Sequence, residues 1–76
     1  MTKKKWGQHF LKSKSIAESI TRAADVKYGD NILEIGPGHG ILTKALLKSN
    51  AKVTAVEIDP ELCSKLRKKF EKEKNF

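Results

Sequence analysis

Three glycines and one glutamate have the types and spacing needed to hold a sugar-bearing ligand. Gly36, Gly38 and Gly40 directly follow residues 32–35, a short apolar run that predicts a buried β-strand. A glycine has no Cβ, so a ligand can lie against the backbone at the end of that strand. Glu57 ends a second predicted strand, 21 positions after Gly36. An acid about 20 residues beyond such a loop accepts hydrogen bonds from ribose hydroxyls.

Two other interpretations of these residues stay open. The glycines could form a β-to-α turn without a ligand, and Glu57 could be a solvent-exposed strand end. A dinucleotide-binding unit is a third possibility, but its G-x-G-x-x-G fingerprint places the third glycine at position 41, which is Ile41. The G-x-G-x-G spacing found here resembles the first motif of S-adenosylmethionine-dependent methyltransferases, whose cofactor has no phosphate.

The elements that must position these residues are predicted in the order helix, strand, helix, strand, helix. The first helix starts with a capping box of Ser15 and Glu18 and ends near Val26. The second strand covers residues 52–58, and Asp59 caps the third helix with Pro60 at its first position. The strands are expected to be parallel with a right-handed crossover, which gives an α/β, partial Rossmann-like fold.

Apolar periodicity predicts which side of each helix is buried. The buried sides are predicted to be Ile16, Ile20, Ala23 and Ala24 in the first helix; Ile41, Leu42, Ala45 and Leu46 in the second; and Leu62, Leu66 and Phe70 in the third. Lys44 and Lys48 are expected to face water, Asn50 to adopt a left-handed backbone after the second helix, and Glu34 to accept backbone N–H groups of the loop. The lysine-rich stretch 65–74 is expected to be mostly solvated.

Composition sets limits on the class of protein. The 76 residues carry a formal charge of +7 and a single cysteine, so an intramolecular disulfide is excluded and no metal cluster is predicted. No apolar run approaches the roughly 20 residues of a membrane span, and a cytoplasmic protein is expected. The positive charge favours nucleic acid or, alternatively, reflects solubility alone. A two-stranded parallel sheet is incomplete by itself, because parallel sheets are normally covered on both faces.

Three segments together resemble the ribosomal RNA adenine dimethyltransferases. They are G-Q-H-F-L at residues 7–11, L-E-I-G-P-G-H-G-I-L-T at 33–43 and V-E-I-D at 56–59. The first is the discriminating segment, and the G-P-G form looks more like the small-subunit dimethylases than the erythromycin-resistance methylases. The resemblance implies an N-terminal fragment of such an enzyme, with S-adenosylmethionine as cofactor and small-subunit rRNA as partner.

The resemblance also implies roles for individual residues. Gly36 and Gly38 would form the floor under the cofactor and Glu57 would hold its ribose, while a loop containing Gln8, His9 and Leu11 would cover its methionine end. Residues 1–14 would then be a basic arm and covering loop, and 15–76 a βαβ cofactor-binding unit. No catalytic or metal-binding residue is assigned.

The family's adenine-reading acid follows a third strand and its target-base motif a fourth, so this chain alone is expected to be inactive. A different class of function remains open: a small basic RNA-binding module without catalysis. It would use Lys3, Lys4, Lys5, Trp6, Lys12 and Lys14.

Overall fold

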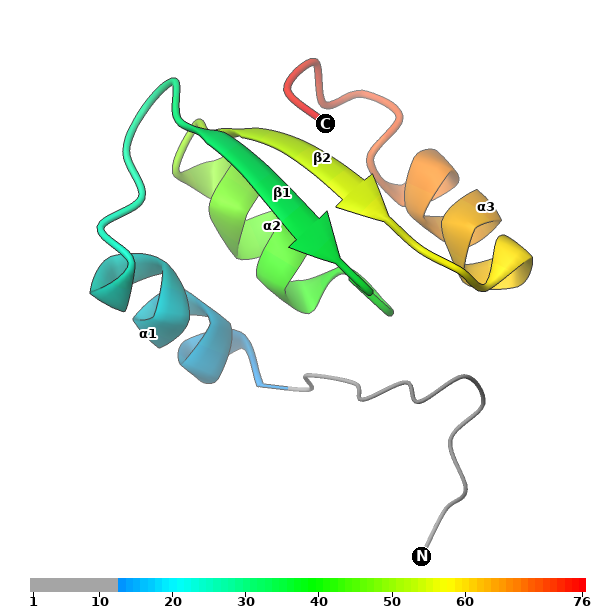
Figure 1. Ribbon diagram of the computed structural model, residues 1–76, viewed down its shortest axis with the longest axis horizontal. Coiled ribbons are helices and arrows are strands. Elements are labelled where there is room, and N and C mark those ends of the chain that lie inside the picture. Colours follow the sequence, from blue (N-terminus) through cyan, green and yellow to red (C-terminus); the bar gives the residue numbers. More distant parts are fainter. Residues whose placement is uncertain (1–12) are drawn as a thin grey trace, which may run out of the picture.

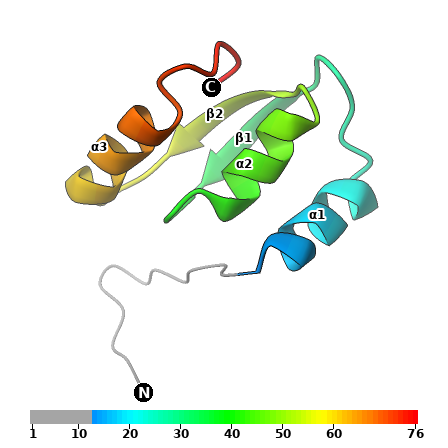
Figure 2. The same cartoon turned by 180° about the vertical axis from the view of Figure 1, so that it is seen from behind.

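The computed structural model describes residues 13–76, in which three helices cover one face of a two-stranded sheet (Figure 1). The elements are α1 (Lys14–Ala23), β1 (Asn31–Ile35), α2 (Ile41–Lys48), β2 (Lys52–Val56) and α3 (Pro60–Lys69). Figure 2 shows α2 lying across the strands, with α1 on one side of it and α3 on the other. The predicted α/β order of elements is confirmed.

The two strands are parallel, as predicted, and pair from Asn31↔Lys52 to Ile35↔Val56. The Gly36 N–H donates to the Val56 carbonyl at 2.8 Å, which extends the pairing one step beyond the end of β1. β2 ends at Val56 and not at Ile58 as predicted, so Glu57 lies just outside the sheet.

The predicted capping box of α1 is wrong. The N-cap is Ser13, whose backbone is extended and whose Oγ accepts from the Ile16 N–H at 3.2 Å. Ser15 therefore lies inside the first turn, where it cannot act as a cap for Glu18. Two serines two positions apart offered alternative starts, and the sequence pattern selected the later one.

The predicted end of α1 is also too late. The helix ends at Ala23, because Asp25 adopts a left-handed backbone with φ of 53°. The Val26 N–H then donates to the Thr21 carbonyl at 3.2 Å, which closes the helix end.

The buried side of α1 differs from the predicted one. Ile16 and Ile20 are 52% and 42% exposed, and Ala23 and Ala24 are exposed too, whereas Ala17 and Thr21 are buried. The Thr21 hydroxyl donates to the Ala17 carbonyl at 2.9 Å, so its burial leaves no unpaired polar group. Small side chains allow α1 to lie close to α2, and packing against α2 outweighs the apolar pattern.

α2 buries more of its surface than one stripe. Ala45 and Leu46 are buried as predicted and Lys44 and Lys48 are exposed, but Ile41 and Leu42 are only half-buried, while Thr43 and Leu47 are buried. A helix that has the sheet on one side and α1 on another needs a wider apolar surface. The buried core cluster consists of Leu46, Leu47, Val53, Leu66 and Phe70.

The start of α3 and the turn after α2 are confirmed. The Asp59 Oδ1 accepts from the Glu61 N–H at 3.0 Å, and Pro60 is the first helical residue. Leu62, Leu66 and Phe70 are buried, and Asn50 has a φ of 62°.

Residues 70–76 return along β2, which no pattern in the sequence predicts. The Val53 N–H donates to the Asn75 carbonyl at 2.7 Å, and the Asn75 side-chain amide donates to the Ala51 carbonyl at 2.6 Å. The Phe76 ring lies 5.1 Å from the Phe70 ring, centroid to centroid. The intervening stretch, residues 71–74, is exposed as predicted.

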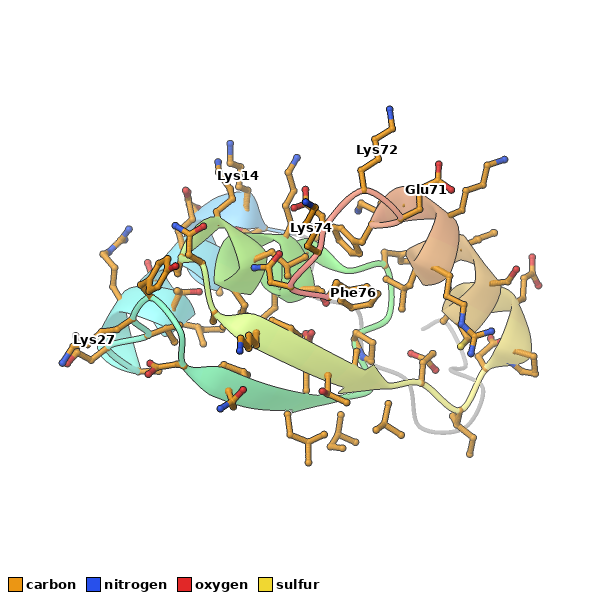
Figure 3. All side chains as sticks on the ribbon, turned by 90° about the horizontal axis from the view of Figure 1, so that it is seen from above. Lys14, Lys27, Glu71, Lys72, Lys74 and Phe76 are labelled. Carbon is orange, nitrogen blue, oxygen red and sulfur yellow. The ribbon has the colours of Figure 1, made fainter. Side chains whose placement is uncertain are left out.

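The face of the sheet opposite the helices is open in the described part of the chain (Figure 3). Four apolar side chains of this side are 52–70% exposed: Leu33, Ile35, Val56 and Ile58. Since parallel sheets are normally buried on both faces, this open apolar face fits the prediction of an incomplete sheet.

Candidate functional site

Strand register brings Gly36 and Glu57 to the same edge of the sheet. Every residue of β1 pairs with the residue 21 positions later in β2, ending with Ile35 opposite Val56. The next residue of each strand, Gly36 and Glu57, therefore leaves the sheet at its carboxyl end beside the other. This edge is where open α/β sheets bind ligands.

The Glu57 carboxylate connects the two loops at that edge. Its Oε1 accepts from the Gly38 N–H at 3.1 Å, and its Oε2 accepts from the Asp59 N–H at 2.9 Å. A carboxylate has about four acceptor positions, and these two bonds occupy only two of them. The remaining positions could accept from two neighbouring hydroxyl groups, such as those of a ribose.

The N–H groups of the three glycines are already paired with acceptors of the protein. Gly36 donates to the Val56 carbonyl at 2.8 Å, Gly38 to Glu57, and Gly40 to the Pro37 carbonyl at 3.0 Å. A pyrophosphate cradle depends on backbone N–H groups that point at the ligand. With these three N–H groups paired and a carboxylate beside them, the loop suits an uncharged sugar better than a phosphate.

Gly36 and Gly40 have different structural reasons to be glycine. Both have positive φ, 66° and 83°. A Cβ at Gly36 would meet no atom within 4 Å, so the space beside it is open. A Cβ at Gly40 would lie 2.8 Å from Leu66 and 2.9 Å from Phe70, so Gly40 allows α3 to pack against the loop. Sequence reasoning placed all three glycines near a ligand and missed this packing role.

Lys69 also supports the loop, a role that no pattern in the sequence predicts. Its Nζ donates to the His39 carbonyl at 2.9 Å and lies 5.4 Å from the centre of the Phe70 ring. The contact joins the end of α3 to the glycine loop.

The predicted contact of Glu34 with backbone N–H groups of the loop is wrong. Its Oε1 instead accepts from the Thr43 hydroxyl of α2, and both residues are buried. Burial raises the pKa of Glu34, and the Thr43 hydrogen bond partly opposes this. Glu34 therefore ties β1 to α2.

Other features of the described residues do not compete with this edge as a site for a small-molecule cofactor or a metal ion. A hollow of about 590 Å³ lies at the opposite end of the strands, beside Asn31 and Lys52, where α/β sheets do not usually bind ligands. Within residues 13–76 no three His, Cys, Asp or Glu side chains gather to hold a metal ion. No helix in that range is long and apolar enough to span a membrane.

Three of the six predicted cofactor-binding residues, Gly36, Gly38 and Glu57, are thus brought together. The other three, Gln8, His9 and Leu11, lie outside the described residues, as do Lys3 to Lys5, Trp6 and Lys12. A ribose-bearing cofactor fits this edge, because the space next to the Gly36 Cα is open and the Glu57 carboxylate, bonded to the Gly38 N–H, has further acceptor positions.

Comparison with known proteins gives consistent matches over the chain. A family model described as ribosomal RNA adenine dimethylase matches residues 1–76. The protein named ribosomal RNA small subunit methyltransferase A is 50% identical over 72 residues in Thermosynechococcus vestitus, which covers 95% of this chain and 27% of the relative. Its namesake in Corynebacterium jeikeium is 56% identical over 63 residues, covering 83% of this chain and 20% of the relative. The chain thus spans about a quarter of the length of these relatives.

A solved structure shares the fold. The crystal structure of the 23S rRNA methyltransferase ErmE matches with a TM-score of 0.79 and 37% sequence identity, over 88% of this chain and 28% of that one.

Proposed function

This chain belongs to the ribosomal RNA adenine dimethylase family, and from that premise we propose that it is the N-terminal part of an S-adenosylmethionine-dependent rRNA adenine N6-dimethyltransferase. The cofactor, when bound, supplies a sulfonium-linked methyl group for the exocyclic nitrogen of adenine. Enzymes that modify a base draw it out of its stack into a pocket. We propose small-subunit rRNA as the partner and the cytoplasm as the location.

Sequence identity favours a small-subunit rRNA dimethylase over an erythromycin-resistance methylase. The two relatives named for the small ribosomal subunit are 50% and 56% identical to this chain, compared with 37% for the 23S rRNA methyltransferase.

One observation carries the choice of cofactor: the glycine N–H groups are already paired, and Gly38 is paired with Glu57 itself. A dinucleotide would need such groups for its pyrophosphate. S-adenosylmethionine has no phosphate, so at this edge it needs a floor without side chains and an acceptor for its ribose hydroxyls. In this proposal Gly36 and Gly38 are the floor, Glu57 holds the ribose hydroxyls, and Gln8, His9 and Leu11 cover the methionine end.

The test is a titration of the ¹⁵N-labelled chain with S-adenosylmethionine and, separately, with NAD. We expect S-adenosylmethionine to shift the amide signals of Gly36, Gly38 and Glu57, while the amide of Gly29 at the opposite end of the strands stays unchanged. Preferential shifts with NAD would overturn the cofactor assignment in favour of a dinucleotide-binding unit.

We propose that the chain alone does not turn over. The family motif that grips the target adenine follows a fourth strand, and residues 13–76 contain two. A methyl-transfer assay on small-subunit RNA with only these 76 residues should give no product above the cofactor-free background. Product formation would refute this part of the proposal.

A further inference from the structure

Four lysines from three helices surround one hollow on the helix-covered side of the molecule. They are Lys14 of α1, Lys44 and Lys48 of α2, and Lys69 of α3, here called the lysine face. All four residues are exposed. Figure 3 shows Lys14 on the side of the helices that points away from the sheet. None of these side chains belongs to the proposed cofactor site.

The lysine face has little negative charge to balance it. Glu18 is the one acidic residue among those lining the hollow. Within residues 13–76 the ion pairs join Lys27 to Asp25 and Lys65 to Glu61, so no lysine of this face is in an ion pair there. Lys44 and Lys48 are also one helical turn apart, a spacing at which like charges destabilise a helix. A polyanion would relieve that repulsion.

The size of the hollow points to a phosphate group. Its volume is about 190 Å³, below the roughly 300 Å³ at which small-molecule pockets begin. A hollow of this size suits a small group such as one phosphodiester better than a whole nucleotide cofactor. A second hollow shares Lys44, Lys48 and Lys69 and is also lined by one acidic residue, Glu73. The two hollows together make a basic strip across α2 that could follow successive phosphates.

We infer that the lysine face binds the sugar-phosphate backbone of RNA. The choice of RNA among polyanions rests on the proposed function. Lys69 connects this face to the glycine loop through the His39 carbonyl and still has two ammonium hydrogens for a phosphate. An RNA strand on the lysine face would therefore run beside the cofactor edge.

The test uses two variants with the same loss of charge. Lys44→Gln/Lys48→Gln removes half of the lysine face, whereas Lys27→Gln/Lys52→Gln removes two exposed lysines elsewhere. Binding of a fluorescein-labelled RNA hairpin is measured by anisotropy at several salt concentrations. We expect the first variant to bind more weakly and to reduce the slope of log K against log salt by about 2, one for each lost phosphate contact. The control variant should have the same slope of log K against log salt as the wild type, to within about 0.5.

Equal losses of RNA affinity in both variants would overturn the inference, because they would indicate an effect of net charge alone. Wild-type binding that does not depend on salt would overturn it too. Tighter binding to phosphatidylserine vesicles than to RNA would also overturn it, in favour of a membrane surface. A second measurement needs no variant: RNA should shift the Lys14, Lys44 and Lys48 amides of the wild-type chain more than those of Lys27 and Lys52. These measurements contain no cofactor, so a failed S-adenosylmethionine titration leaves them interpretable.

Discussion

Replacing Glu57 by alanine should destabilise the fold as well as the proposed site. The substitution removes the acceptor of the Gly38 and Asp59 N–H groups. Gly38 is buried, so its N–H is left without a partner, whereas Asp59 is half-buried and water can replace its bond. A hydrogen bond to a charged group contributes about 1.5–3 kcal/mol. Counting only the Gly38 bond, we expect a loss of about 1.5–3 kcal/mol in the free energy of unfolding.

That loss corresponds to a fall in Tm of about 6–24 °C, because 1 kcal/mol shifts a domain of this size by about 4–8 °C. The assay is thermal unfolding followed by circular dichroism. The matched control is Glu71→Ala, which removes an exposed carboxylate and should change stability by less than about 0.5 kcal/mol. Glu57→Gln keeps one acceptor oxygen and should fall between wild type and Glu57→Ala. If Glu57→Ala and Glu71→Ala have the same Tm, the Glu57 carboxylate does not hold the loop. The contacts argued to orient this carboxylate toward a ribose would then be refuted.

Three further predictions concern the same loop and its support. Gly40→Ala should destabilise the fold more than Gly29→Ala does, because both glycines have φ near 83° but only at Gly40 would the new Cβ collide with Leu66 and Phe70. The free energies of unfolding of the two variants, measured in urea, should differ by about 1–3 kcal/mol. Equal losses would contradict the packing role of Gly40. Gly36→Ala should have the same free energy of unfolding as Gly29→Ala, yet it should bind S-adenosylmethionine more weakly than the wild type when measured by calorimetry. Unchanged affinity would show that no ligand approaches Gly36. The difference in free energy of unfolding between Glu34→Gln and the wild type should favour the variant more at pH 7 than at pH 4. The reason is that burial raises the pKa of Glu34 above its ordinary 4.5, so the contribution of Glu34 to wild-type stability falls as the pH rises through the folded-state pKa and the carboxyl ionises. An equal difference in urea midpoint at both pH values would contradict that sign.

The order of elements and the edge that joins them could be predicted from the sequence, because both depend on local signals. β-branched runs, the Asp59 cap, the Pro60 start and the glycine cluster each specify backbone conformation within a few residues. The meeting of Gly36 and Glu57 then follows from parallel pairing alone, without knowledge of the core. These are the features that hold however the helices pack.

The features that could not be predicted depend on contacts between elements far apart in the sequence. Ile16 and Ile20 formed the more apolar side of α1, yet the small residues Ala17 and Thr21 face α2. Gly40 appeared to belong to a ligand loop, but its missing Cβ is required by Leu66 and Phe70, which lie 26 and 30 positions later. Asn75 pairs with the edge of β2 from a stretch with no strand pattern. In each case the deciding neighbour is absent from the local pattern.

The 21-residue spacing between Gly36 and Glu57 has a physical meaning that sequence counting alone does not reveal. It equals the register offset of β1 and β2, and that offset is the combined length of β1 and of the connection through α2. A longer or shorter crossover would change the count, but it would still place the residue after β1 beside the residue after β2, provided the buried side of each strand kept its register. The requirement for holding a ribose is therefore an acid directly after the second strand and a glycine directly after the first. The count of about 20 follows from the length of β1 and of the whole connection through α2.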